Sequence, residues 1–161
     1  MYRYDGTRFV RFGVDEGLPA NYVTSLATGS GGELWVGTWS GVARLVGSRF
    51  EAPPRASGLP PVYVNGIGLE SKDRLWVANA RGLFFGQPKG RFEAVPGWPR
   101  GAATALYVDA RGTDVYAASE DPIEGVGTTL VLDSLRAHGH RSVQLLPRAA
   151  IVSSLLQQLS A

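Results

Sequence analysis

The chain has 161 residues, of which 44% are hydrophobic and 19% charged, a composition too apolar for a disordered segment. Sixteen basic and fourteen acidic residues leave a formal net charge of +2, which argues against a general nucleic-acid binder. No apolar run approaches the roughly 18 residues of a membrane span, the first residues do not form a signal peptide, and the absence of cysteine excludes disulfides and zinc knuckles.

Segments of the chain repeat at an interval of about 41 residues. The sequence Gly-Leu-Pro at 17–19 recurs at 58–60, and a degraded copy, Gly-Trp-Pro, follows at 97–99. Because several anchor residues recur with the same spacing, the sequence predicts an array of similar units. The anchors are aromatic residues, glycines and the phenylalanines of an Arg-Phe pair: Trp35, Trp76 and Tyr116; Gly41 and Gly82; Phe9, Phe50 and Phe92.

Each repeat contains four short apolar segments separated by turn-forming residues, and the first repeat shows them in order. Residues 22–27 are one apolar segment, a turn follows at Gly31-Gly32, and residues 34–36 (Leu-Trp-Val) are the second segment. A third segment begins after Gly41, and the fourth contains Phe50. Four strands in about 40 residues, with an aromatic residue at a fixed position, predict the all-β blade of a β-propeller, made of four antiparallel strands.

The interval divides residues 1–126 into propeller repeats. Residues 1–16 overlay the second half of a blade, and residues 17–57, 58–96 and 97–126 are predicted to be three successive blades. Residues 127–161 have two interpretations. Leu146-Pro147 resembles the turn at Leu18-Pro19, which predicts the end of the third blade and then the start of a fourth repeat. Alternatively, apolar residues spaced by about four predict a short C-terminal helix: Ile151, Val152, Leu155, Leu156 and Leu159.

The sequence of residues 17–45, GLPANYVTSLATGSGGELWVGTWSGVARL, closely resembles the two-component regulator propeller repeat. The resemblance extends over residues 1 to about 118, with departures at Val77-Ala78-Asn79 and in the third repeat. It implies a ligand-sensing, usually periplasmic part of a bacterial hybrid sensor kinase or a related membrane-bound signalling protein. The expected location is therefore periplasmic or extracytoplasmic, and the expected role is non-catalytic signal transduction.

Three blades do not close a ring, and the flanks of a blade are apolar faces that need neighbours. Three arrangements would supply those neighbours. The chain is a piece of a larger propeller, or a piece whose copies assemble into a ring, or a small closed ring in which the first and last strands pair. The expected partners are therefore further propeller blades in a parent chain or other copies of this chain.

Six residues are predicted ligand contacts because they lie on loops that flank the expected strands. Loops before the inner strands border the central channel of a propeller, where aromatic faces beside hydrogen-bonding groups suit an oligosaccharide or another small polar ligand. A plainer interpretation makes the same residues turn asparagines and partly buried rings. They are Asn21, Tyr22, Trp39, Tyr63, Asn65 and Arg81.

The repeated aromatic residues Trp35, Trp76 and Tyr116 occupy one position within the second strand, which predicts packing between blades rather than ligand stacking. The resemblance further implies that the polar residues just beyond those strands bond neighbouring turns. These residues are Thr38, Asn79 and Ser119.

No motif in the sequence predicts catalysis or a bound cofactor. His138-Gly139-His140 has no further ligand at metal-binding spacing, and residues 125–129 lack the lysine of a phosphate-binding loop, so we expect no metal and no cofactor. The carboxylates are scattered over turns. Three hypotheses remain: a non-catalytic ligand-binding sensor segment, a protein-interaction scaffold without a small ligand, and a fragment of a propeller enzyme that acts on polysaccharides.

Overall fold

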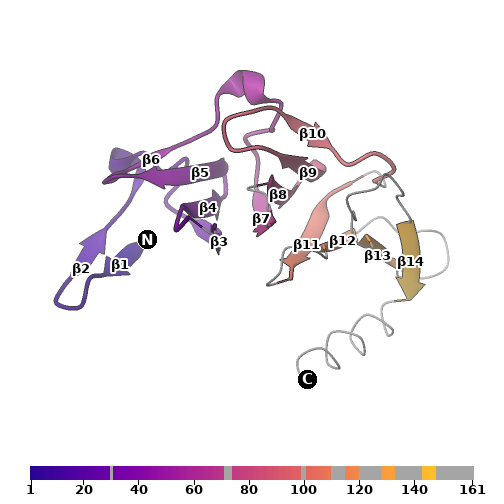
Figure 1. Cartoon of the computed structure of the whole chain (residues 1–161), viewed down its shortest axis with the longest axis horizontal. Helices are drawn as coiled ribbons and strands as arrows, with labels where there is room; N and C mark the ends of the chain where they lie inside the picture. The colour runs from indigo at the N-terminus through magenta and orange to yellow at the C-terminus, as the bar shows by residue number, and fades with distance from the viewer. Residues whose placement is uncertain are drawn as a thin grey trace.

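A computed structural model of the chain describes residues 1–29, 31–70, 74–98, 101–109 and 115–119, together with the backbone of two strands at 128–132 and 143–147. The described sheets lie side by side in an open arc, with strands β3, β7 and β11 on its concave side (Figure 1). No helix in these ranges is long and apolar enough to cross a membrane. In chain order the elements are β1 (Tyr2–Tyr4), β2 (Phe9–Arg11), the 3-10 turn η1 (Val14–Glu16), β3 (Val23–Thr28), β4 (Leu34–Thr38), β5 (Gly41–Val46), β6 (Arg49–Glu51), the 3-10 turn η2 (Arg55–Ser57), β7 (Val64–Glu70), β8 (Arg74–Asn79), β9 (Gly82–Gly86), β10 (Phe92–Ala94), β11 (Ala103–Val108), β12 (Val115–Ser119), β13 (Thr128–Leu132) and β14 (Val143–Pro147).

Two complete blades form the centre of the arc, and both have the four antiparallel strands that the repeat predicts. One sheet has the order β3-β4-β5-β6 and the other the order β7-β8-β9-β10. The turn between the second and third strands requires a left-handed backbone at its last residue, with φ of 111° at Gly41 and 130° at Gly82. Only glycine adopts this conformation without strain, which explains why it recurs at this position. The all-β propeller-blade architecture predicted from the sequence is therefore confirmed.

Strands flank these two blades on either side. β1 and β2 form a hairpin before the first blade, while β11 pairs with β12 and β13 pairs with β14 after the second. β13 also lies against β12. The structure places Leu146 and Pro147 at the end of strand β14, paired with Thr129 and Thr128, rather than in the turn that opens a fourth repeat. Proline is tolerated there because β14 is an edge strand of the described sheet, paired only with β13.

Two other features of the C-terminal region lie outside the described residues. They are the helix predicted from the apolar stripe at 151–159 and the His138-Gly139-His140 segment.

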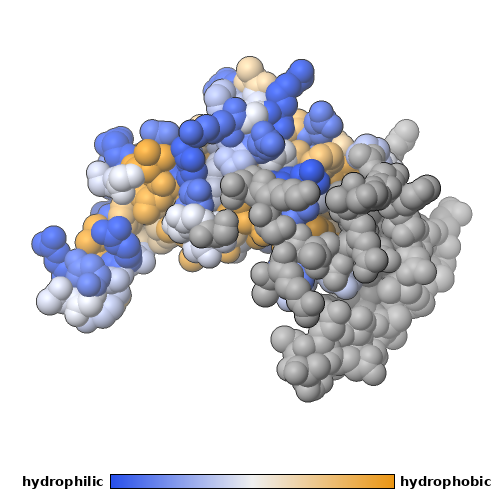
Figure 2. Space-filling view, viewed as in Figure 1, coloured by the Kyte–Doolittle hydropathy of each residue, from blue (hydrophilic) through white to orange (hydrophobic). Residues whose placement is uncertain are grey.

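The core consists of apolar side chains packed between neighbouring sheets. Trp35 and Trp76 are 2% and 0% exposed, and each belongs to a cluster that also contains inner-strand residues of the following blade. Tyr116, at the equivalent position of the third repeat, is half-buried and contacts Tyr107 with ring centroids 6.2 Å apart. Figure 2 shows hydrophobic residues along the body of the arc and hydrophilic residues along its convex edge. A blade therefore gains most of its buried apolar surface from its neighbour, as expected for a repeat array.

Candidate functional site

Three exposed aromatic rings from two neighbouring blades meet at one edge of the sheets. Tyr22 stacks on Trp39 with ring centroids 4.3 Å apart and planes inclined by only 12°. Trp39 also contacts Tyr63, at a centroid distance of 6.1 Å and a tilt of 41°. The three side chains nevertheless remain 64%, 51% and 42% exposed. We call Tyr22, Trp39 and Tyr63 the aromatic cluster.

The strand topology brings these residues to the same edge. Tyr22 immediately precedes β3 and Trp39 immediately follows β4, and the two strands are antiparallel, so both residues lie at one end of the blade. The Trp39 amide donates a hydrogen bond to the Tyr22 carbonyl at 3.2 Å, and the Ala80 amide donates the equivalent bond to Tyr63 at 3.0 Å. Because Ala80 replaces a ring at that position, Trp39 is the aromatic residue that joins the two blades.

The other three predicted ligand contacts lie nearby in the fold but have different environments. The Asn21 side-chain oxygen accepts a bond of 3.3 Å from the Val14 amide at an exposed position. The Asn65 amide group donates to the Ala103 carbonyl at 2.7 Å and so joins the second blade to the third. Arg81 is exposed in the turn after β8, where its own amide donates to the Asn79 side chain at 2.8 Å. The structure therefore brings together Tyr22, Trp39 and Tyr63, with Arg81 at the same edge.

Polar residues hold the turns that carry this edge, and they are the last residues of the second strands, β4 and β8, rather than residues just beyond them. The Thr38 hydroxyl donates to the Gly41 carbonyl at 2.8 Å and accepts from the Ser40 amide at 3.1 Å. Asn79 plays the corresponding role in the second blade through its bond from Arg81. Both residues are fully buried, so these bonds fix the loop conformations beneath the aromatic cluster.

A hollow lies at the opposite end of the inner strands. It has a volume of about 320 Å³, and none of the six predicted ligand contacts lines it. Leu26 and Tyr107, which are 56% and 48% exposed, belong to its wall together with Thr28, Leu69 and Asp109. This hollow was not predicted from the sequence, because the residues that line it have the pattern of ordinary strand residues. The sequence feature that could mark the hollow is a large side chain, such as Leu26 or Tyr107, at an inner-strand position that is not buried between blades.

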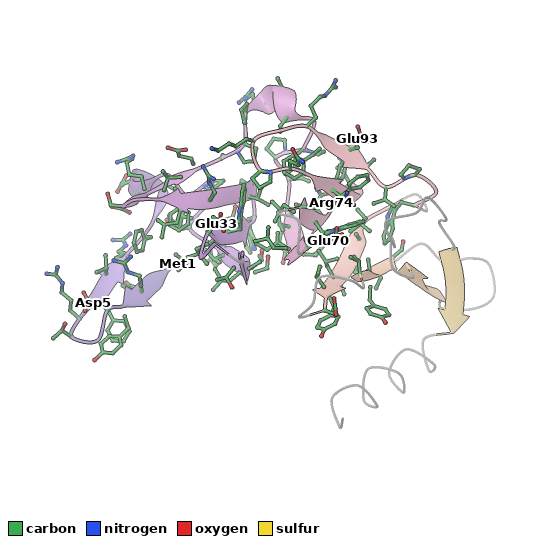
Figure 3. All side chains as sticks on the ribbon, viewed as in Figure 1. Met1, Asp5, Glu33, Glu70, Arg74 and Glu93 are labelled. Carbon is green, nitrogen blue, oxygen red and sulfur yellow. The ribbon has the colours of Figure 1, made fainter. Side chains whose placement is uncertain are left out.

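The described residues contain no group of three or more histidine or carboxylate side chains that could hold a metal ion. Glu70 and Arg74 form an ion pair of 3.6 Å at the edge between β7 and β8 (Figure 3). The backbone amide of Arg8, followed by that of Thr7, holds the pKa of Asp5 below its ordinary value, but Asp5 lies in the first hairpin. The groups that the structure brings together at this edge are the rings of the aromatic cluster, with Arg81 in the turn beside them.

Comparison with known proteins agrees with the blade architecture. The two-component regulator propeller family matches residues 17–40, so these residues are a repeat of that type. The chain is similar to the extracellular domain of a putative hybrid two component system from B. thetaiotaomicron, with a TM-score of 0.65 and 20% identity, over 92% of this chain and 20% of that one. A second such domain from the same organism has a TM-score of 0.54 and 17% identity, over 93% of this chain and 25% of that one. At these identities the similarity concerns the fold.

Short stretches of the chain are also similar in sequence to an enzyme, UDP-N-acetylmuramate–L-alanine ligase. The UDP-N-acetylmuramate–L-alanine ligase of Rhodospirillum centenum is 43% identical over 47 residues, which cover 29% of this chain and 10% of the ligase. The ligase of Deinococcus radiodurans is 41% identical over 71 residues, which cover 43% of this chain and 15% of the ligase. The chain therefore spans only about a tenth to a seventh of the length of these ligases.

Proposed function

We propose that the chain is a non-catalytic, ligand-binding segment of an extracytoplasmic sensor propeller in a bacterial signal-transduction protein. The observation that carries this proposal is the aromatic cluster, in which two blades present three contacting rings to solvent. Large exposed apolar surfaces of this kind on otherwise polar edges mark binding sites. The two similar solved structures, both extracellular domains of putative hybrid two component systems, support the sensor role.

The chemistry of the cluster favours an oligosaccharide or another small polar ligand with an apolar face. Tyr22 and Trp39 cover part of each other, so a ligand would contact their free faces and edges and the tilted ring of Tyr63. The tyrosine hydroxyls and the guanidinium of Arg81 supply hydrogen-bonding groups at the same edge. Flat apolar surfaces combined with a few polar groups are typical of small-ligand sites.

The experiment is a thermal-shift screen of the chain against a panel of oligosaccharides and small polar metabolites. A ligand at a hundred times its Kd stabilises the native state by about 2.7 kcal/mol, which raises the melting temperature by several degrees. We expect one class of ligand to do so. Trp39→Ala should weaken its binding at least tenfold, or by about 1.4 kcal/mol.

The matched control is Tyr107→Ala, which removes a comparably exposed ring at the opposite end of the inner strands. It should leave the affinity unchanged. If no small ligand shifts the melting temperature and a protein partner binds through Trp39, the scaffold hypothesis replaces the sensor hypothesis. If a polysaccharide is cleaved and the turnover depends on a carboxylate of the chain, the enzyme hypothesis replaces both.

The similarity to ligases does not support ligase activity of this chain, because about a tenth of a ligase cannot contain the whole enzyme.

A further inference from the structure

The hollow at the far end of the inner strands exposes backbone groups as well as side chains. Its volume of about 320 Å³ is large enough for a small molecule. The Gly29 amide donates to the Glu33 carbonyl at 2.9 Å. Hydrogen-bonded and non-hydrogen-bonded pairs alternate along an antiparallel ladder, so the backbone groups of Leu26 and Thr28 point away from β4. The registers of β7 on β8 and of β11 on β12 give the same result in the next two repeats. The residues with such groups that line the hollow are Leu26, Thr28, Ile67, Leu69, Leu106 and Val108.

A buried carboxylate oxygen lies beside this hollow. Oε2 of Glu33 is buried and has no hydrogen-bond partner in the described part of the chain. A Cβ atom on Gly29 would stand 2.6 Å from this oxygen and 3.6 Å from Cδ1 of Leu69, which belongs to the wall of the hollow. The oxygen therefore lies next to the wall that the second blade contributes. Burying a charged group without a partner costs free energy, so a hydrogen-bond donor would bind favourably at this oxygen.

The second blade shows how a carboxylate at this end of the strands obtains its partners. The repeat interval of 41 residues places Glu70 at the position of Gly29. It also places Arg74 at the position of Glu33. Oε2 of Glu70 accepts a hydrogen bond of 3.0 Å from Nε1 of Trp76 and lies 3.6 Å from the guanidinium of Arg74 (Figure 3). In the first blade Glu33 itself takes the place of the arginine, and it forms no ion pair with the described residues. The first blade thus has a carboxylate at this end but not the cation that accompanies it in the second.

We propose that the hollow binds a small organic cation, namely a protonated amine that carries an apolar group. The ammonium group donates hydrogen bonds to Oε2 of Glu33 and to the backbone carbonyls that face the hollow. The apolar group contacts Leu26 and Tyr107, which are 56% and 48% exposed. The ring of Tyr107 also attracts the positive charge. Asp109 contributes a second carboxylate residue to the wall.

Two features favour an organic cation over a metal ion at this site. The described part of the chain contains no group of three or more histidine or carboxylate side chains that could hold a metal. Most of the residues that line the hollow are apolar, and they suit the hydrocarbon part of an amine rather than a hydrated ion. The site is also separate from the aromatic cluster, since no residue of that cluster lines the hollow.

The test compares phenethylamine with 2-phenylethanol, which has the same apolar group but a hydroxyl in place of the amine. A primary amine has a pKa near that of lysine and is protonated at pH 7, whereas the alcohol is neutral. The backbone amide chemical shifts of Leu26 and Tyr107 report binding in the full chain. We expect a saturable shift with phenethylamine and an affinity at least tenfold higher than that of the alcohol.

The variant Glu33→Gln should weaken the binding of phenethylamine at least tenfold. It should leave the urea midpoint at or above that of the original chain, because it replaces an unpaired charge with a neutral group of the same shape. The matched control is Glu51→Gln, which removes a carboxylate from an exposed position on the outermost strand β6. This control should leave the affinity for phenethylamine unchanged, and so should Trp39→Ala in the aromatic cluster.

Four results would overturn the proposal. They are the absence of a saturable shift with phenethylamine, equal affinities for the amine and the alcohol, equal effects of Glu33→Gln and Glu51→Gln, and loss of amine binding in Trp39→Ala. Displacement of the amine by calcium chloride would also overturn it, because the hollow would then be a metal site. None of these readouts depends on whether another ligand binds at the aromatic cluster.

Discussion

Gly37 in β4 lies so close to Val64 of the next blade that a Cβ atom on the glycine would stand 2.6 Å from Cγ1 of the valine. At the equivalent position of the second blade, Ala78 fits within a cluster that contains Ala103 of the third. Val64 and Ala103 are equivalent because both open the inner strand of their blade. The size of one residue is thus matched to its neighbour across each interface, which explains why glycine is replaced by alanine in the second repeat.

The first prediction follows from this matching. Gly37→Ala should lower the free energy of unfolding by about 1–3 kcal/mol, as expected for overpacking. Combining it with Val64→Ala should destabilise less than the sum of the two single changes, because the smaller residue makes room for the added methyl group. The Ser25 hydroxyl is also close to Gly37, but it can rotate away. A double-mutant cycle in urea measures the coupling, and additive effects would contradict the proposed contact.

The second prediction concerns the buried indole of Trp76. This side chain is fully buried, packs against Phe85 with ring centroids 5.2 Å apart, and donates from Nε1 to a Glu70 carboxylate oxygen at 3.0 Å. Trp76→Ala should cost about 3–5 kcal/mol of stability. Trp76→Phe should cost clearly less, because it keeps most of the packing and loses the hydrogen bond. Trp39→Ala, at an exposed position, is the matched control and should leave the urea midpoint nearly unchanged.

The third prediction separates the two roles considered for Asn65. Its hydrogen bond to the Ala103 carbonyl joins two blades, so Asn65→Ala leaves that carbonyl without this partner and should cost about 1–3 kcal/mol. Asn21→Ala is the control, since the Asn21 bond is long and exposed, and it should change stability by less than about 0.5 kcal/mol. If Asn65→Ala weakened ligand binding while leaving the urea midpoint intact, a ligand-contact role would replace the structural one.

The blades were predictable from sequence because each is specified by local signals. Glycines such as Gly41 mark turns that need a left-handed backbone, and the regular spacing of Trp35 and Trp76 reveals the repeat. The exposure of the Phe9 side chain was not predictable in this way. It occupies the same repeat position as Phe50, but its burial depends on strands from outside its own hairpin, and a repeat pattern says nothing of whether those strands are present.

The candidate site was predictable only in part. Loop position and residue type selected Tyr22, Trp39 and Tyr63, yet the contact between Trp39 and Tyr63 depends on how two blades pack, which no local signal encodes. The same reasoning selected Asn65, whose amide group instead bonds to the neighbouring blade. Asn65 lies near the start of β7 rather than on the loop before it. The local sequence around such an asparagine is the same in either role, because it does not reveal where the next sheet lies.

The last prediction uses the turn of the first hairpin. The Asp5 carboxylate accepts hydrogen bonds from the amides of Arg8 and Thr7, each of 3.0 Å, and from the Thr7 hydroxyl at 3.1 Å. These bonds favour the charged form and lower its pKa from the ordinary value of 3.8. Their contribution to hairpin stability is therefore complete above that value and is lost as the pH falls through the lower, folded-state pKa.

The amide chemical shifts of Thr7 and Arg8 should therefore change in a single transition centred below pH 3.8. Asp5→Asn should abolish the transition, because the amide side chain does not titrate. The equivalent turn between β5 and β6, at Gly47-Ser48, contains no carboxylate and serves as an internal reference whose amides should stay constant over the same range. A transition centred at or above 3.8, or the same transition in both turns, would show that acid acts on the blades as a whole rather than on Asp5.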